Sequence, residues 1–160
     1  MGTPAAVVTE LEGAAGWTGR YVNSDGHLDS LGIDLFKAYH DAFDGDVQAM
    51  INKLILEPTH DWSVLAGTDM SLEPAWYEFP SDRPYPPRTY AGRAGEPATP
   101  RLKTGDDFGT YLYLLGEDGM NVYVKYADDR NVPAWTFIAW DTPVGEVEQL
   151  LRKLQARINS

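Results

Sequence analysis

The chain has 160 residues, 43% of them hydrophobic and 12% aromatic, and this length and composition favour one folded domain and exclude wholesale disorder. It contains no cysteine, which excludes disulfides, thiolate metal sites and cysteine nucleophiles. With a formal net charge of -11, no basic N-terminal segment and no long apolar run, we expect a soluble, cytoplasmic protein that binds neither nucleic acid directly nor a membrane.

Two strands and two helices are predicted in the first third of the chain, and the first strand is a short one that opens at Val7 and Val8. Residues 17–22 are aromatic and β-branched, which is typical of a strand. Residues 29–43 and 46–57 both repeat apolar side chains at helical spacing. Asp29, or the serine after it, is expected to cap the first helix, and Asp46 to cap the second.

Residues 58–105 form a long excursion rich in proline and aromatic residues. Eight of the 11 prolines lie between Pro58 and Pro100, which excludes a central strand or a long helix there. Either the aromatic side chains hold this excursion against the core, or the excursion is an arm that presents them to a protein partner. In the second interpretation the partner-binding residues are Trp76, Tyr77, Phe79, Tyr85, Arg88 and Tyr90.

The last third predicts a meander followed by a helix. Residues 110–129 contain two strands around a Gly-Glu-Asp-Gly turn, and residues 134–140 form a third strand. Residues 142–158 repeat apolar side chains at helical spacing, with acidic residues early and basic residues late. The sequence therefore predicts one α+β domain over residues 1–160. Its antiparallel sheet of about four or five strands is covered by two N-terminal helices and one C-terminal helix.

Two interpretations apply to the segment Tyr-Val-Asn-Ser-Asp-Gly-His-Leu-Asp-Ser-Leu-Gly at residues 21–32. Asn, Ser, Asp and Gly favour a turn, and Asp29 then serves the helix that follows. Alternatively, the carboxylates and the imidazole of Asp25, His27 and Asp29 suit a divalent metal or an acid–base site. The further ligands of such a site would be His40, His60 and Asp61.

This segment carries a resemblance. Together with the Asp-Trp-Ser-Val-Leu segment at 61–65, the Pro-rich middle and the later hairpin, it resembles small uncharacterised single-domain proteins of actinobacteria and their phages. Those proteins have a Tyr-x-His-x-Asp-Gly-Tyr-Pro type of stretch after their first strand. In this chain Asn23 stands in the place of that His, His27 stands in the place of the Tyr, and Leu28 stands in the place of the Pro. The resemblance implies a phage or actinobacterial origin and a single domain, and it brings no activity with it.

The negative charge is concentrated in the first half of the chain. Residues 1–80 contain 13 acidic and 3 basic residues, whereas residues 81–160 contain 11 acidic and 10 basic residues. The acidic half is either a solvated surface or a face that docks on a basic protein, in the place that nucleic acid would take.

We therefore expect a non-enzymatic accessory protein, encoded by a phage or another mobile element. It would use no cofactor and would bind a protein partner. One form of this expectation is an inhibitor of a basic, nucleic-acid-handling protein. One alternative is a small metal-dependent hydrolase or nuclease that uses Asp25 and His27. The other is a virion or assembly component.

Overall fold

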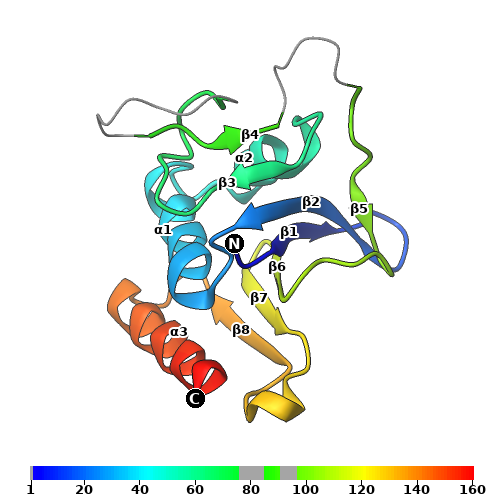
Figure 1. Cartoon of the computed structure of the whole chain (residues 1–160). Helices are drawn as coiled ribbons and strands as arrows, with labels where there is room; N and C mark the ends of the chain where they lie inside the picture. The colour runs from blue at the N-terminus through cyan, green and yellow to red at the C-terminus, as the bar shows by residue number, and fades with distance from the viewer. Residues whose placement is uncertain (1, 76–84, 91–96) are drawn as a thin grey trace.

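The computed structural model describes residues 2–75, 85–90 and 97–160. Within them the chain forms one mixed sheet of eight strands with its main helices on one face (Figure 1). The predicted α+β class is confirmed. The prediction of four or five antiparallel strands is wrong, because the sheet contains two parallel pairings and gains short strands from the Pro-rich excursion.

Five strands build the body of the sheet. They are β1 (Ala5–Glu10), β2 (Trp17–Ser24), β6 (Tyr111–Leu115), β7 (Gly119–Val124) and β8 (Trp135–Ala139). The spatial order is β2-β1-β6-β7-β8, and all neighbours are antiparallel except β1 and β6, which are parallel. The predicted C-terminal meander is therefore confirmed as β6, β7 and β8, with β8 at one edge of the sheet.

The Pro-rich excursion contributes the other edge. Its strands are β3 (Trp62–Val64), β4 (Arg88–Thr89) and β5 (Leu102–Lys103). β3 pairs in parallel with the end of β2, β4 pairs with β3, and β5 pairs with the beginning of β2. Proline lacks a backbone donor and fixes φ, so strands from such a sequence are short and lie at an edge.

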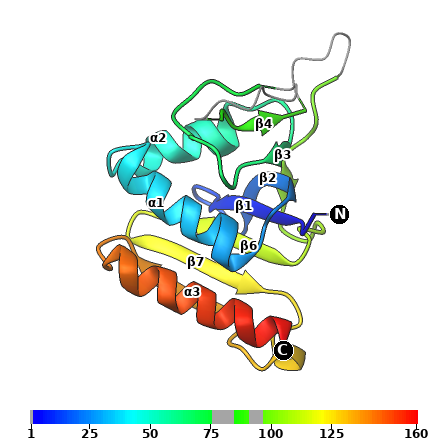
Figure 2. The same cartoon turned by 60° about the vertical axis from the view of Figure 1, so that its left-hand side comes forward.

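The helices cover one face of the sheet. They are α1 (Ile33–Asp41), preceded by the wide turn η1 (Leu28–Gly32), α2 (Val47–Ile51), continued by the wide turn η2 (Asn52–Leu56), and α3 (Val144–Asn159). Figure 2 shows α1 and α3 in front of the strands. The main core lies between these helices and the sheet, where Phe36, Trp62 and Tyr113 are fully buried.

Of the two caps predicted for the N-terminal helices, one is present. The Oδ1 atom of Asp46 accepts a hydrogen bond from the amide of Ala49 at 3.0 Å, which confirms Asp46 as the cap of α2. The prediction for Asp29 is wrong, because η1 begins at Leu28 and makes no capping bond with a side chain at its N-terminus. The buried amide of Leu28 instead donates to Oε1 of Gln155 at 2.8 Å, so α3 supplies the missing acceptor.

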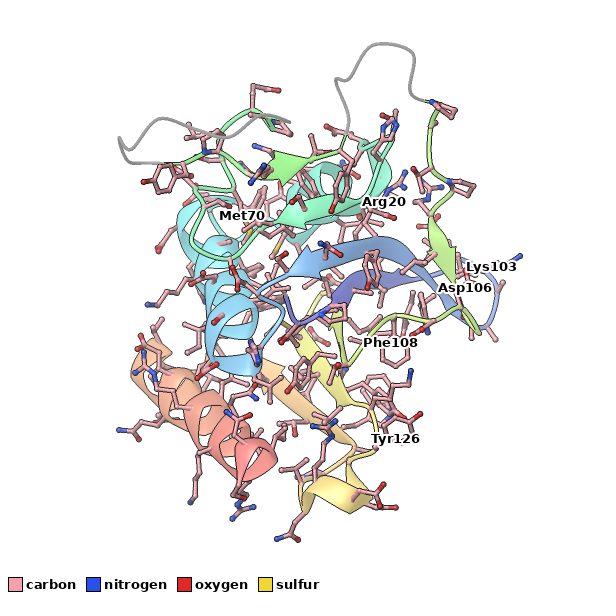
Figure 3. The ribbon with its side chains drawn as sticks, in the orientation of Figure 1. Arg20, Met70, Lys103, Asp106, Phe108 and Tyr126 are labelled. Carbon is pink, nitrogen blue, oxygen red and sulfur yellow. The ribbon has the colours of Figure 1, made fainter. Side chains whose placement is uncertain are left out.

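A buried arginine fastens the excursion to the sheet. Arg20 on β2 is 3% exposed, and its guanidinium donates to the carbonyl oxygens of Thr99 at 2.7 Å and Pro58 at 2.6 Å. Asp61 lies 3.5 Å from the same guanidinium. Burial lowers the pKa of Arg20, with Asp61 opposing the shift, and burial raises the pKa of Asp61. Figure 3 shows Arg20 between β2 and the segment that it holds.

We expect Arg20→Met to lower the free energy of unfolding by about 3–5 kcal/mol, because it leaves the partly buried Asp61 and two carbonyl groups without their donor. Urea denaturation followed by tryptophan fluorescence measures this change. Arg101→Met is the matched control, since Arg101 is exposed and donates one bond of 3.3 Å to the carbonyl oxygen of Leu56 at the end of η2. Its effect is expected to stay within about 0.5 kcal/mol. Equal losses in the two variants would contradict the assigned role of Arg20.

Candidate protein-binding surface

The segment after β2 is a turn built by distant side chains. Asp25 is exposed and has a φ of 59°, a left-handed conformation that Asp tolerates in turns. The amide of Gly26 donates to the carbonyl of Thr3 at 2.8 Å, and the hydroxyl of Tyr113 donates to the carbonyl of Gly26 at 2.7 Å. The Nε2 atom of His27 lies 2.9 Å from the hydroxyl of Thr3. These bonds support the turn interpretation of the segment.

The structure does not bring the predicted metal ligands together. His27 bonds to Thr3, whereas His40 on α1 bonds through Nε2 to the carbonyl of Trp140 at 2.7 Å. His60 lies beyond η2 and is within 2.9 Å of the hydroxyl of Thr59. Asp25 and Asp29 are exposed on either side of His27, and Asp61 pairs with Arg20. Among the described residues no three His, Asp or Glu side chains are placed to hold a metal ion.

The predicted binding residues of the excursion are only partly described. Trp76, Tyr77 and Phe79 lie outside the described residues. Tyr85 and Tyr90 are half-buried, and Arg88 lies in β4, at the sheet edge opposite β8. Their role in partner binding stays a prediction.

A cavity of about 440 Å³ lies beside Tyr90, and it is lined by Tyr21, His60 and Asp61 among others. Asp61 accepts a hydrogen bond from the amide of Tyr21 at 3.2 Å, and this bond completes the edge of β2 between β3 and β5. The Nε2 atom of His60 is buried without a hydrogen-bond partner in the described structure. The carboxylate of this cavity therefore serves the fold.

One large hollow of the described structure is acidic. It has a volume of about 880 Å³ and lies where β1 ends, where β6 turns into β7 and where α1 leads into α2. Its described lining contains no Lys or Arg. It contains four carboxylates, which are Glu10, Asp46, Glu117 and Asp118. We call this feature the acidic hollow.

Aromatic rings line the face of the sheet that the helices leave open. Phe108 packs edge-on against Tyr123, with ring centroids 5.7 Å apart, and Tyr123 lies 4.8 Å from Trp135. Trp135 is 51% exposed and Phe137 is 54% exposed, both on β8. In Figure 3, Phe108 and Tyr126 lie on the side of the sheet away from α1 and α3. We call Phe108, Tyr123, Trp135 and Phe137 the aromatic strip.

The acidic hollow and the aromatic strip meet at Phe137, which belongs to both. The ring of Phe137 lies over Gly119, where an added Cβ atom would come within 2.7 Å of the ring. Glycine at this position therefore lets the ring lie against the sheet beside the β6–β7 turn. The result is one continuous surface, acidic at the strand ends and aromatic along β8.

The sequence contains a signal for the aromatic strip. In residues 134–140, successive side chains alternate between the two faces of the strand, and both faces are apolar. A single helical layer can cover only one face. Trp135 and Phe137 therefore had to lie on the opposite face from Ile138, which is 3% exposed beneath the helices.

Comparisons with protein-family models, with curated proteins and with solved structures find no match to this chain. Among the described residues, no helix is long and apolar enough to cross a membrane.

We expect Phe137→Thr to change the free energy of unfolding by no more than about 0.5 kcal/mol, because the ring is mostly exposed and Thr suits a strand. Ile138→Ala, one residue further on the buried face, should cost about 2–5 kcal/mol. Chemical denaturation of the two variants checks this difference. A large loss for Phe137→Thr would show that this ring serves folding.

Burial raises the pKa of Tyr113 well above its ordinary value of 10.0. Above about pH 10, the unfolded state releases a proton that the folded state keeps, so the free energy of unfolding falls as the pH rises. Tyr113→Phe removes this contribution and flattens the alkaline dependence. At neutral pH it should lower stability by about 1–3 kcal/mol, because the carbonyl of Gly26 loses its donor. Denaturation curves from neutral pH to about pH 11 test both effects. If the free energy of unfolding falls with pH equally in the original protein and in Tyr113→Phe, the ionisation assigned to Tyr113 is wrong.

Proposed function

We propose that this protein is a non-enzymatic accessory protein that binds a basic segment of a protein partner through the acidic hollow and the aromatic strip. One observation carries the proposal. The described lining of a hollow of about 880 Å³ contains four carboxylates and no basic residue, and the hollow runs directly into the exposed rings of β8.

The chemistry of this surface favours Lys and Arg side chains. Carboxylates at the rim of the acidic hollow attract cations and speed their diffusional encounter. Exposed tryptophan and phenylalanine faces bind ammonium and guanidinium groups by cation–π attraction. The aromatic strip already contains one such contact, because Nζ of Lys125 lies 5.7 Å from the ring centroid of Phe108. Aromatic side chains are also the groups that protein interfaces use as anchors.

The proposal includes the origin and the biological setting inferred from the sequence. Proteins that handle nucleic acid typically have basic surfaces. An acidic protein that binds such a surface would compete with the phosphate groups of the nucleic acid. The resemblance to proteins of actinobacteria and their phages supports an accessory protein of a mobile element that inhibits such a partner. The carboxylates come from both halves of the chain, because Glu10 and Asp46 lie in the acidic half and Glu117 and Asp118 in the other.

The test uses a fluorescein-labelled peptide, Lys-Val-Lys-Val-Lys-Val-Lys, and measures its fluorescence anisotropy with the full chain. We expect saturable binding that weakens by about tenfold or more when the salt concentration is raised about tenfold, because exposed charges are screened. The peptide Glu-Val-Glu-Val-Glu-Val-Glu, with the same alternation and the opposite charge, should not bind.

A pair of charge-neutralising variants locates the binding. Glu117→Gln combined with Asp118→Asn should weaken the Lys-Val peptide by about fivefold or more, since each pair is worth up to about 1 kcal/mol. Asp25→Asn combined with Asp29→Asn removes the same charge from the exposed segment after β2, away from the acidic hollow and the aromatic strip, and should change the affinity less than twofold. Equal effects, or no saturable binding of the Lys-Val peptide, would overturn the proposal.

A further inference from the structure

The strand β8 has a free backbone edge. Among the strands of the described residues it is the last in the sheet order, and it pairs only with β7. The amide of Val124 donates to the carbonyl of Ala134, and the amide of Trp140 donates to the carbonyl of Asp118. The even-numbered residues 134–140 therefore direct their backbone groups toward β7. The odd-numbered residues Trp135, Phe137 and Ala139 direct theirs outward.

The outward groups of β8 are available for bonding. Within the described structure, no hydrogen bond reaches the amide or carbonyl of Trp135 or Phe137, and the carbonyl of Ala139 accepts one from the amide of Thr142. The same residues place their side chains on the open face, where Trp135 and Phe137 are exposed. Backbone donors, backbone acceptors and exposed rings thus coincide on two adjacent outward positions.

This edge lacks the features that normally protect sheet edges. Natural edge strands are kept from pairing by charged residues, prolines, bulges or short length. The opposite edge follows this rule, because β4 has two residues, contains Arg88 and pairs with β3 through an irregular register. β8 has five residues, is uncharged and keeps a regular register along its whole length. An edge of this kind is typical of proteins that receive an additional strand.

We propose that β8 receives an extended basic peptide from the partner as a further strand of the sheet. This inference rests on the proposed function and specifies its binding mode. A second copy of this chain would also fit the backbone edge, but two copies each carry a net charge of -11 and repel each other. A basic peptide gains from the same charge. Its alternate side chains would lie over Trp135 and Phe137.

The residues at the end of β8 also favour a basic peptide. The backbone carbonyl of Asp118 accepts a hydrogen bond from the amide of Trp140, so Asp118 lies beside Trp140. Asp141, the residue after Trp140, is exposed. A peptide strand that runs along β8 therefore reaches carboxylates where the strand ends, beside the acidic hollow. A Lys or Arg at that position of the peptide would be paired, and an acidic residue would be repelled.

The test is amide hydrogen exchange by NMR, with the full chain alone and with saturating Lys-Val-Lys-Val-Lys-Val-Lys peptide. In the free protein, the amides of Thr136 and Ile138 should exchange slowly, and those of Trp135 and Phe137 fast. With the peptide, Trp135 and Phe137 should exchange at least about tenfold more slowly, because their amides then lie within the sheet.

Each outcome decides one part of the proposal. If the peptide binds by anisotropy but exchange at Trp135 and Phe137 is unchanged, strand addition is wrong and the proposed function survives. If the peptide does not bind, the proposed function fails and this inference fails with it. If protection rises with protein concentration in the absence of peptide, the occupant is a second copy and the basic peptide is wrong.

Two N-methylated versions of the peptide provide an independent check. In an added strand, only alternate peptide amides donate to β8. Methylating the three valine amides and methylating three lysine amides should therefore have different effects, with one version losing at least tenfold in affinity and the other less than threefold. Equal losses would show that only side chains bind and would overturn strand addition.

Discussion

The parallel pairing of β1 with β6 joins the two halves of the chain, and the rest of the structure depends on it. β1 lies between β2 and β6, and Ala5 to Val8 are fully buried. Because parallel strands end at the same edge of a sheet, the pairing also fixes which loops meet. Glu10 is the last residue of β1, and Glu117 and Asp118 follow β6, so their carboxylates gather at one end of the molecule. The acidic hollow is thus a consequence of the strand order.

The helices determine the second part of the binding surface. All three lie on one face of the sheet, and their apolar sides bury Tyr113, Met120 and Ile138. The other face has only a small buried cluster around Ala6, Val8 and Leu112. Phe108 and Tyr123 pack against this cluster, whereas Trp135 and Phe137 on β8 are left in contact with solvent. Large exposed aromatic side chains on a regular strand favour an interaction surface.

Local structure was predictable from the sequence where the causes are local. Helical periodicity predicts the helices, the position of Asp46 predicts a cap, and Asp25 and Gly26 predict the turn, which begins only after Ser24 at the end of β2. Pairings between distant residues were not predictable. Nothing near Leu28 in the sequence indicates that Gln155 bonds to its amide, and nothing near Pro58 indicates Arg20. The acidic hollow was missed for the same reason, because its carboxylates meet only after β1 and β6 pair.

The overall charge explains how such an edge can persist. A bare, uncharged strand with exposed rings invites pairing with other copies, and most proteins avoid it through the strand itself. In this chain the protection is carried by the whole molecule, since a net charge of -11 opposes the approach of a second copy. The same field draws in a cationic partner and brings it to the edge. Repulsion of like chains and attraction of basic ones are two effects of a single charge distribution, so selectivity requires no charged residue on β8.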